Sequence, residues 1–205
     1  MRVRYLAIDP GNKQSGWIYF TESKPHIGGV DPILFGTTEN KLLRSSFANG
    51  PWDARSTMLL IEAPKPRGMP TAGEEMEMMI ELGKFLECWD RLGGEYSYVF
   101  RQDVKLHLCG TARAKDKNVN QAIRDRFGGE QKGVKCPLCN GKGWRGRDHI
   151  ECPQCDGEKW ERMPGPLAGV TGHVYAALAV GLWFIDHGIV HQRIINPNQN
   201  TKGNA

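Results

Sequence analysis

The sequence predicts an α/β fold that is interrupted by a small inserted subdomain. Short apolar runs typical of buried strands alternate with segments of helical periodicity, which favours a sheet covered by helices. Two of the apolar runs end in an acidic residue followed closely by proline, which indicates where a functional site would lie. Late in the chain, four cysteines form two close pairs, a pattern typical of a small metal-binding insertion.

Composition limits the broad class of protein. The chain has 205 residues, of which 40% are hydrophobic and 24% charged, enough for one core and a small appendage. No apolar stretch approaches the roughly 20 residues of a spanning helix, so we expect a cytoplasmic chain with no membrane partner. The formal charge of +4 is modest, so any nucleic-acid contact must depend on local clusters of cations.

The N-terminal part is predicted to be a β meander. Residues 3–9, 15–20 and 33–37 have the apolar patterns of strands and are separated by turns rich in Gly, Pro and Asn. Residues 41–48 favour a short helix, which leads into a fourth strand at 58–62.

Helical periodicity dominates the rest of the chain outside the cysteine region. Residues 74–92 carry two apolar stripes, one beginning at Met76 and one at Met78. One stripe would pack on the sheet, and the other would meet a partner subunit or be buried as well. A strand at 95–101 and the short segment 104–108 follow, and further helices are predicted from Asp116 to residue 127 and over 171–187.

Two strand ends carry acids in the same way. Asp9 closes the first strand ahead of Pro10-Gly11, and Glu62 closes the fourth ahead of Ala63-Pro64. Adjacent strands lie about 4.8 Å apart, so acids at neighbouring strand ends can share metal ions. Carboxylates are ligands that Mg²⁺ and Mn²⁺ prefer, so the pair predicts one metal site.

The four paired cysteines predict a structural zinc site. Their C-x2-C pairs are separated by twelve residues, the spacing of a four-cysteine zinc ribbon that holds one Zn²⁺ tetrahedrally. Two disulfides in a secreted protein are the alternative. The first pair, with its C-x2-C-x-G-x-G pattern, resembles the zinc domain of DnaJ, whereas the second departs from it at Glu158-Lys159. The remaining cysteines, Cys88 and Cys109, are expected to be buried. The predicted zinc ligands are Cys136, Cys139, Cys152 and Cys155.

Two groups of cations are candidate DNA contacts. Arg113, Lys115 and Lys117 precede or open a predicted helix, whose free N–H groups and positive dipole favour a phosphate. A solvated charge run is the alternative. Trp144, Arg145 and Arg147 lie between the cysteine pairs and would suit stacking on a base or insertion into a groove, although the tryptophan would equally well cover the zinc site.

His173 opens the last predicted helix. The positive end of the helix dipole disfavours the imidazolium, which leaves a neutral ring able to bind metal or accept a proton. A capping or surface residue is the ordinary interpretation of a lone histidine there. The two strand-end acids elsewhere in the chain favour the functional interpretation.

In combination, these segments resemble the RuvC family of Holliday-junction resolvases, which are ribonuclease H-like nucleases. The similar segments follow the order of that family and cover most of the chain outside the cysteine region. They are Leu6-Ala-Ile-Asp9-Pro-Gly11 with Ser15-Gly16, Leu60-Ile-Glu62, Gly110-Thr-Ala-Arg113-Ala-Lys115-Asp-Lys117-Asn-Val119, and His173-Val-Tyr-Ala176-Ala-Leu-Ala-Val180.

The resemblance implies a mixed five-stranded sheet with helices on both faces, a homodimer, and two Mg²⁺ or Mn²⁺ ions per active site. Asp9, Glu62 and His173 would be the catalytic metal ligands. The family has an aspartate one helical turn after the histidine position, where this chain has Ala176. A water, a substrate phosphate or a loop acid such as Glu74 or Glu75 would complete the shell, or the second ion would bind weakly.

The implied activity is a metal-dependent cut in a four-way DNA junction or other branched DNA, that of a crossover junction endodeoxyribonuclease. Another ribonuclease H-like nuclease, acting on flaps, general DNA or RNA, and a non-catalytic branched-DNA binding protein are the alternatives. Zinc-interrupted RuvC-like proteins occur among bacteriophages, which implies a phage origin and a location in the host cytoplasm. The expected organisation is a nuclease domain at 1–129 and 164–190, a zinc ribbon at 130–163, and a disordered polar tail at 191–205.

Overall fold

The structure is a computed structural model. It describes residues 3–22, 29–64, 73–128, 134–135, 138, 142, 144–145, 150–151, 160–161, 167 and 169–187. The four predicted zinc ligands, Arg147 and the tail at 191–205 lie outside the described residues. Of the predicted tip of the zinc ribbon, the structure describes only the backbone of Trp144–Arg145.

Five strands and five helices make up the main body. The strands are β1 (Arg4–Asp9), β2 (Gln14–Glu22), β3 (Val30–Glu39), β4 (Thr57–Ala63) and β5 (Tyr96–Phe100). The helices are α1 (Asn40–Asn49), α2 (Gly73–Arg91), α3 (Arg101–Cys109), α4 (Asp116–Arg126) and α5 (His173–Asp186), and a single 3-10 turn, η1 (Ala54–Ser56), precedes β4.

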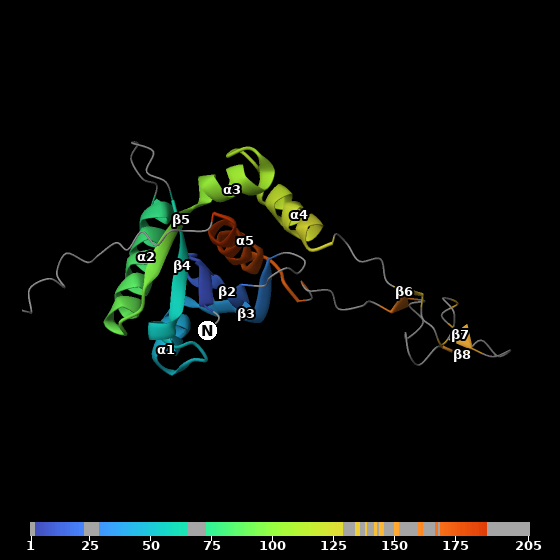
Figure 1. Ribbon diagram of the computed structural model, residues 1–205, viewed down its shortest axis with the longest axis horizontal. Coiled ribbons are helices and arrows are strands. Elements are labelled where there is room, and N and C mark those ends of the chain that lie inside the picture. The colour runs from blue at the N-terminus through green and yellow to red at the C-terminus, as the bar shows by residue number, and fades with distance from the viewer. Residues whose placement is uncertain are drawn as a thin grey trace, which may run out of the picture.

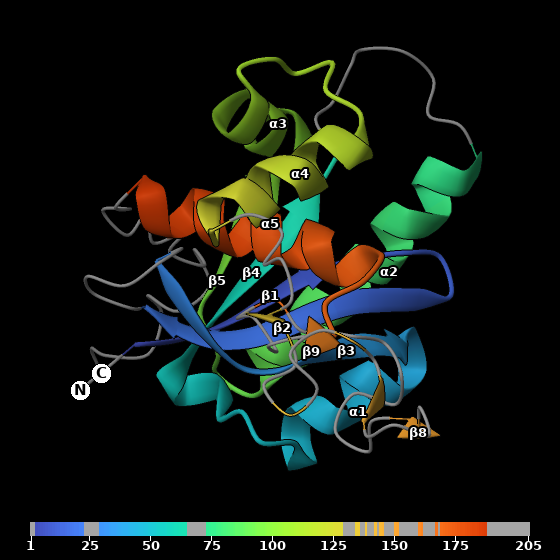
Figure 2. The same cartoon turned by 90° about the vertical axis from the view of Figure 1, so that its right-hand side faces the viewer.

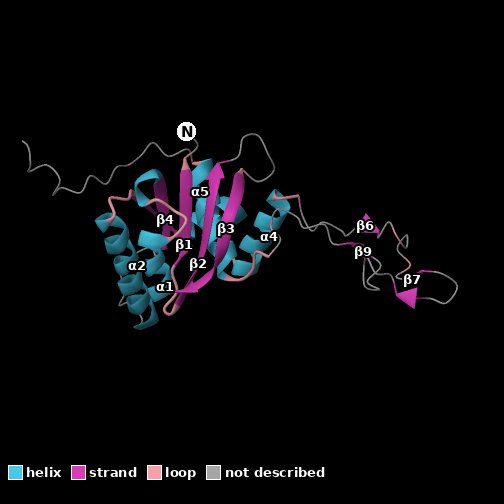
Figure 3. Cartoon of the chain, turned by 90° about the horizontal axis from the view of Figure 1, so that it is seen from below, coloured by secondary structure: helices cyan, strands magenta, loops and turns pink. Residues whose placement is uncertain are grey.

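The strands form one mixed sheet in the order β3-β2-β1-β4-β5 (Figure 3). Strands β1, β2 and β3 pair antiparallel, whereas β4 pairs parallel with both β1 and β5. The expected five-stranded mixed α/β sheet is therefore confirmed. Within the predicted insertion, β6 (Val134–Lys135) pairs with β9 (Trp160–Glu161), and β7 (Trp144–Arg145) pairs with β8 (Ile150–Glu151).

Helices cover both faces of the sheet (Figure 1 and Figure 2). On one face α1 and α2 close a core that includes Phe85 and Trp89. On the other face α5 lies across the strands, with α3 and α4 beside it, over a second core. Side chains alternate between the two cores along each strand: Leu6 and Ile8 of β1 belong to the first core, and Tyr5 and Ala7 to the second.

Helix α2 is confirmed, but its predicted division into two stripes was wrong. Leu82, Phe85 and Trp89, drawn from both predicted stripes, are buried, whereas Met76 and Met79 near its start are exposed. Burial thus changes along the helix, because it is the C-terminal half that packs on the first core.

Cys88 and Cys109 are half-buried free thiols at the margins of the two cores, not the fully buried residues expected. Among the helices of the described residues, none has the length and apolar character needed to cross a membrane.

Candidate active site

Asp9 and Glu62 lie side by side at one edge of the sheet. Strands β1 and β4 run parallel with Ile8 opposite Ile61, and each acid is the next residue on its strand. Because side chains alternate along a strand, both carboxylates point to the face covered by α5. Both side chains are buried, with residue exposures of 6% for Asp9 and 8% for Glu62.

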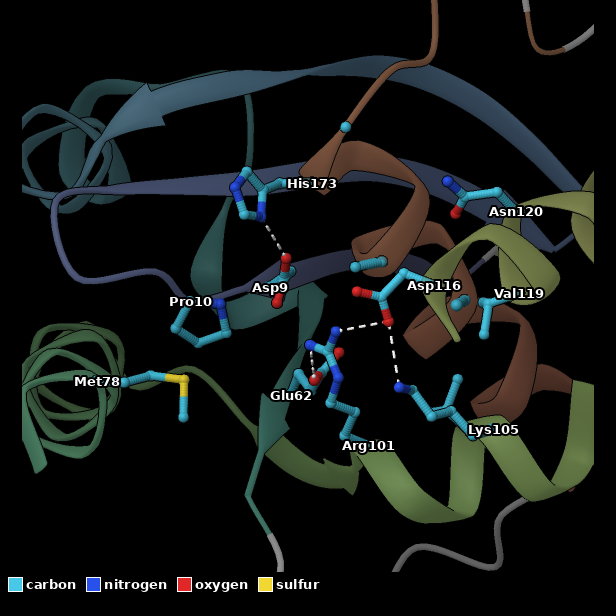
Figure 4. A pocket seen from close by; sticks show the side chains of 14 residues that line it. Asp9, Pro10, Glu62, Met78, Arg101, Lys105, Asp116, Val119, Asn120 and His173 are labelled. Carbon is cyan, nitrogen blue, oxygen red and sulfur yellow. Dashed lines mark hydrogen bonds and ion pairs between the residues drawn. The ribbon is translucent and has the colours of Figure 1, made fainter. Parts of the chain in front are cut away.

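His173 is brought to Asp9 by the start of α5. Its Nδ1 lies 3.0 Å from Oδ2 of Asp9, while about half of the imidazole side chain stays exposed. The helix that carries it is anchored across the sheet, where Gly181 lets α5 approach the ring of Phe20 closely. Three residues predicted from separate segments therefore meet at one place (Figure 4).

A buried hydrogen-bond network fixes the turn that follows Asp9. The Ser15 hydroxyl donates to Oδ1 of Asn40 at 2.7 Å, and Nδ2 of Asn40 donates to the Gly11 carbonyl at 2.8 Å. The Gly11 N–H points back to the Ser15 hydroxyl at 3.4 Å. Asn40, at the start of α1, is almost fully buried, and the sequence analysis did not identify it. This network connects the turn after β1 to the first residue of α1, which directly follows β3.

Sequence reasoning also missed three charged residues in the site, Arg101, Lys105 and Asp116. Arg101 places Nη1 2.9 Å from Oε1 of Glu62 and Nη2 2.9 Å from Oδ1 of Asp116. Lys105 places Nζ 3.2 Å from the same oxygen of Asp116. Figure 4 shows these groups as a continuous chain of ion pairs beside the Asp9–His173 pair.

One signal for Arg101 was available in the sequence. Arg101 directly follows β5, whose last residue, Phe100, pairs with Ala63 of β4. It therefore occupies the same edge of the sheet as the two strand-end acids. Asp116 had no comparable signal, because it stands between two lysines at the start of α4 and belonged to a basic run.

The pKa values of the three acids shift in two directions: those of Asp9 and Glu62 are raised, and that of Asp116 is lowered. Burial, together with the neighbouring Asp9, raises the pKa of Glu62 to about 7, although Arg101 acts in the opposite direction. Burial also raises the pKa of Asp9 despite its contact with His173. The pKa of Asp116 is lowered: its burial is outweighed by Arg101 and Lys105. At Asp9 and Glu62 the effect of burial on the pKa thus exceeds that of the neighbouring His173 and Arg101, whereas at Asp116 the neighbouring cations have the larger effect.

The acids open into a cavity of about 430 Å³. The lining of this cavity combines strand ends, α3, the first turn of α4 and the first turns of α5. It comprises Asp9, Pro10, Glu62, Met78, Arg101, Val104, Lys105, Asp116, Val119, Asn120, Gly172, His173, Ala176 and Ala179.

Other predicted site residues lie outside that lining. Arg113 and Lys115 are exposed in the segment that leads into α4, and Lys117 is exposed in the first turn of α4, next to residues that line the cavity. Glu75 is exposed on α2, and the side chain of Glu74 lies outside the described residues. Ala176 does line the cavity, so the position where the resembled family has an aspartate faces the acids.

The donor set fits a divalent cation. Two buried carboxylates with raised pKa values supply the oxygen ligands that hard cations prefer, and an adjacent imidazole nitrogen can join them. The described part of the chain contains no group of three or more His, Cys, Asp or Glu side chains close enough together to hold a metal ion. Glu62 and Asp116 instead direct their carboxylates to Arg101.

No protein-family model and no curated protein sequence matches the chain. Solved structures are similar to it, among them two of a RuvC. One, of Thermus thermophilus RuvC, has a TM-score of 0.57 at 13% identity and covers 90% of this chain and 96% of that one. The other, T. thermophilus RuvC in complex with a Holliday junction substrate, has a TM-score of 0.55 at 13% identity, with coverages of 91% and 94%. The chain therefore has the RuvC-like, ribonuclease H-like α/β fold.

Proposed function

We propose that this protein is a metal-dependent endonuclease that cuts four-way DNA junctions or other branched DNA. The observation that carries the proposal is the convergence of Asp9, Glu62 and His173, from three distant segments, in one cavity of a RuvC-like fold. The similar structure of a RuvC bound to a Holliday junction substrate supports branched DNA as the substrate class.

Asp9, Glu62 and His173 would hold the divalent cation, Mg²⁺ or Mn²⁺. Such an ion activates water for attack on phosphorus and neutralises charge on the phosphate and the leaving oxygen. The chain's own contribution is the geometry. The Asn40 network fixes the turn after Asp9, and α5 holds His173 against Asp9. His173 is also the most exposed of these three groups.

Phosphate groups of the DNA would meet the basic segment before α4. Arg113 and Lys115 precede α4, Lys117 lies in its first turn, and all three are exposed beside residues of α4 that line the cavity. Cations at that position would hold the backbone beside the cut and would carry no sequence information. These cations would provide positive charge for a polyanion next to the cavity.

The insertion would be a zinc ribbon in which Cys136, Cys139, Cys152 and Cys155 bind one structural Zn²⁺. The proposal also includes a homodimer, because symmetrical cutting of a four-way junction requires two active sites. Trp144, Arg145 and Arg147 would contact DNA at the tip of the ribbon. These parts of the proposal are supported by the sequence patterns alone.

The test is cleavage of a labelled four-way junction beside matched duplex, flap and RNA–DNA hybrid, each with Mg²⁺, with Mn²⁺ and with chelator. Asp9→Asn and Glu62→Gln should abolish product while leaving the thermal unfolding transition in place. Glu87→Gln is the matched control, because Glu87 is exposed on α2 and pairs with Arg91. Undiminished cutting by both site variants would contradict the assignment.

A non-catalytic junction-binding protein is the second candidate, and Ala176 is the observation that favours it. That reading predicts tight junction binding with no metal-dependent product. Preferential cutting of the flap or hybrid would support the assigned active site but would show that the substrate is not a four-way junction. The same panel therefore separates all three outcomes.

A further inference from the structure

The cavity lining has no carboxylate at Ala176, the position where the resembled family has one, and it includes a cation, Arg101. Ala176 contributes only a methyl group to the lining, so α5 supplies no acid there. Arg101 instead reaches into the same cavity from the start of α3. The pair of strand-end acids thus faces a guanidinium on one side and an imidazole on the other (Figure 4).

Arg101 is held in a fixed orientation. Its two terminal nitrogens are each 2.9 Å from a carboxylate oxygen, one from Glu62 and one from Asp116. Lys105, one turn along α3, contacts the same Asp116 oxygen at 3.2 Å and so holds Asp116 in place. A planar guanidinium whose two terminal nitrogens both contact carboxylates is preorganised, so it loses little conformational freedom when it binds an anion.

The contact between Arg101 and Glu62 still permits metal binding. Arg101 contacts Oε1 of Glu62, and a carboxylate has a second oxygen that can bind a cation. Glu62 can therefore bridge the guanidinium and a metal ion, which would place the two positive groups on either side of one carboxylate.

Charge balance favours one metal ion over two. With a metal ion bound, Asp9, Glu62 and Asp116 would all be ionised and would face two fixed cations, Arg101 and Lys105, so these side chains would contribute one net negative charge. One divalent ion together with one phosphodiester would bring the total to zero. A second divalent ion would leave an excess of two positive charges in a half-buried site, where unbalanced charge is costly.

We propose that Arg101 replaces a second metal ion: each active site binds one divalent cation through Asp9, Glu62 and His173, and the Arg101 guanidinium supplies the other positive charge at the attacked phosphate. The inference rests on the proposed function and specifies how its site works. Arg101 would touch a non-bridging phosphate oxygen, and Asp116 and Lys105 would position it.

The test counts metal ions directly. Protein that keeps its zinc but holds no Mg²⁺ or Mn²⁺ is titrated with Mn²⁺, and free Mn²⁺ is measured by electron paramagnetic resonance. Wild type should bind one Mn²⁺ per chain. Arg101→Ala should bind two, because Glu62 and Asp116 lose their cation and become available as ligands. Arg101→Lys should keep a count of one. Arg91→Ala, which removes the same charge from an exposed pair on α2, should match wild type.

Cleavage of the junction gives a second readout. The rate should rise with the first power of Mg²⁺ concentration in wild type and with about the second power in Arg101→Ala. At Mg²⁺ concentrations that saturate wild type, Arg101→Ala should be slower by about 10²–10³-fold. This is the range for removing one preorganised hydrogen-bond donor that stabilises charge in a transition state. Arg101→Gln, which removes the charge but keeps the Cβ and Cγ methylene groups and a polar end, serves as the substitute if Arg101→Ala does not show a cooperative unfolding transition.

Binding of two Mn²⁺ ions per wild-type chain, or an Arg101→Ala cleavage rate within twofold of wild type, would overturn the inference about Arg101. Neither result would contradict the proposed nuclease activity. A wild-type chain that binds no Mn²⁺ and cuts no substrate in the panel would overturn the proposed function itself, and the role of Arg101 with it.

Discussion

His173 lies directly against Gly16, the residue that pairs with Asp9 across β1 and β2. A Cβ on Gly16 would stand 2.4 Å from the carbonyl carbon and oxygen of His173 and 2.6 Å from its Cβ. No side chain fits that space, so the absence of one on Gly16 is what allows the start of α5 to sit over Asp9. The Asp9–His173 contact of 3.0 Å depends on this close approach.

Gly16→Ala should therefore displace the start of α5. We expect the free energy of unfolding to fall by about 1–3 kcal/mol, the usual cost of overpacking, and the divalent-ion affinity to fall with it. Thermal denaturation and Mn²⁺ titration measure the two effects. Gly83→Ala is the matched control: Gly83 is exposed within α2 with open space beside it, and alanine there should be neutral or stabilising by up to about 1 kcal/mol. Equal effects of the two substitutions would contradict the packing argument.

The pKa of Glu62 predicts how the stability of the metal-free protein depends on pH. Burial raises this pKa from an ordinary value of 4.5 to about 7, so the folded chain binds the proton more tightly than the unfolded chain. The stability from the protonated group is complete below pH 4.5 and is lost as the pH rises through about 7. The loss is on the order of 3 kcal/mol.

Urea denaturation between pH 4 and 8 measures this dependence. Glu62→Gln cannot ionise, so its free energy of unfolding should decline less than that of wild type across this range. Glu87→Gln, at an exposed site, should follow wild type. A wild-type curve that stays parallel to that of Glu62→Gln would show that folding does not shift the pKa of Glu62, which would contradict the prediction.

The sequence predicted the site in part, for reasons that lie in the chain itself. Asp9 and Glu62 were found because each ends an apolar run, and parallel strands bring such ends together. Arg101 was missed because the boundary between β5 and α3 falls exactly between Phe100 and Arg101 without any turn residue. The segment that follows is also too short to show helical periodicity. The sequence pattern therefore places Arg101 at the end of the strand and does not indicate that its side chain lies in the site.

The same limit applies to residues that only the tertiary structure connects. Asn40 is separated from Gly11 by two strands, and no local pattern marks it as a partner of that turn. In α2, the apolar residues identify a helix but not which turns reach the core, because that depends on where the underlying sheet ends. The sequence therefore predicts elements and strand ends well and predicts side-chain networks poorly.

The basic segment before α4 should contribute to DNA affinity through phosphate contacts. Lys115→Ala and Lys117→Ala should each weaken junction binding and reduce the slope of log affinity against log salt concentration by about 1. Fluorescence anisotropy with a labelled junction in chelator measures binding without cleavage. Lys84→Ala, which removes a cation paired with Glu81 on α2, should leave the slope unchanged. An unchanged slope in both site variants would mean that these lysines are simply solvated.

The cysteine pairs should hold one zinc ion per chain, which elemental analysis of the purified protein measures. Cys152→Ser should lose that zinc, because three thiolates hold a tetrahedral ion far more weakly than four. Cys88→Ser is the matched control from the same chain, since Cys88 is a free thiol on α2 and should have no part in zinc binding. If zinc were absent and mass spectrometry showed two disulfides instead, the alternative pairing of these cysteines would be correct. If Cys88→Ser released zinc as readily as Cys152→Ser, the assignment of the ligands by their spacing would be wrong.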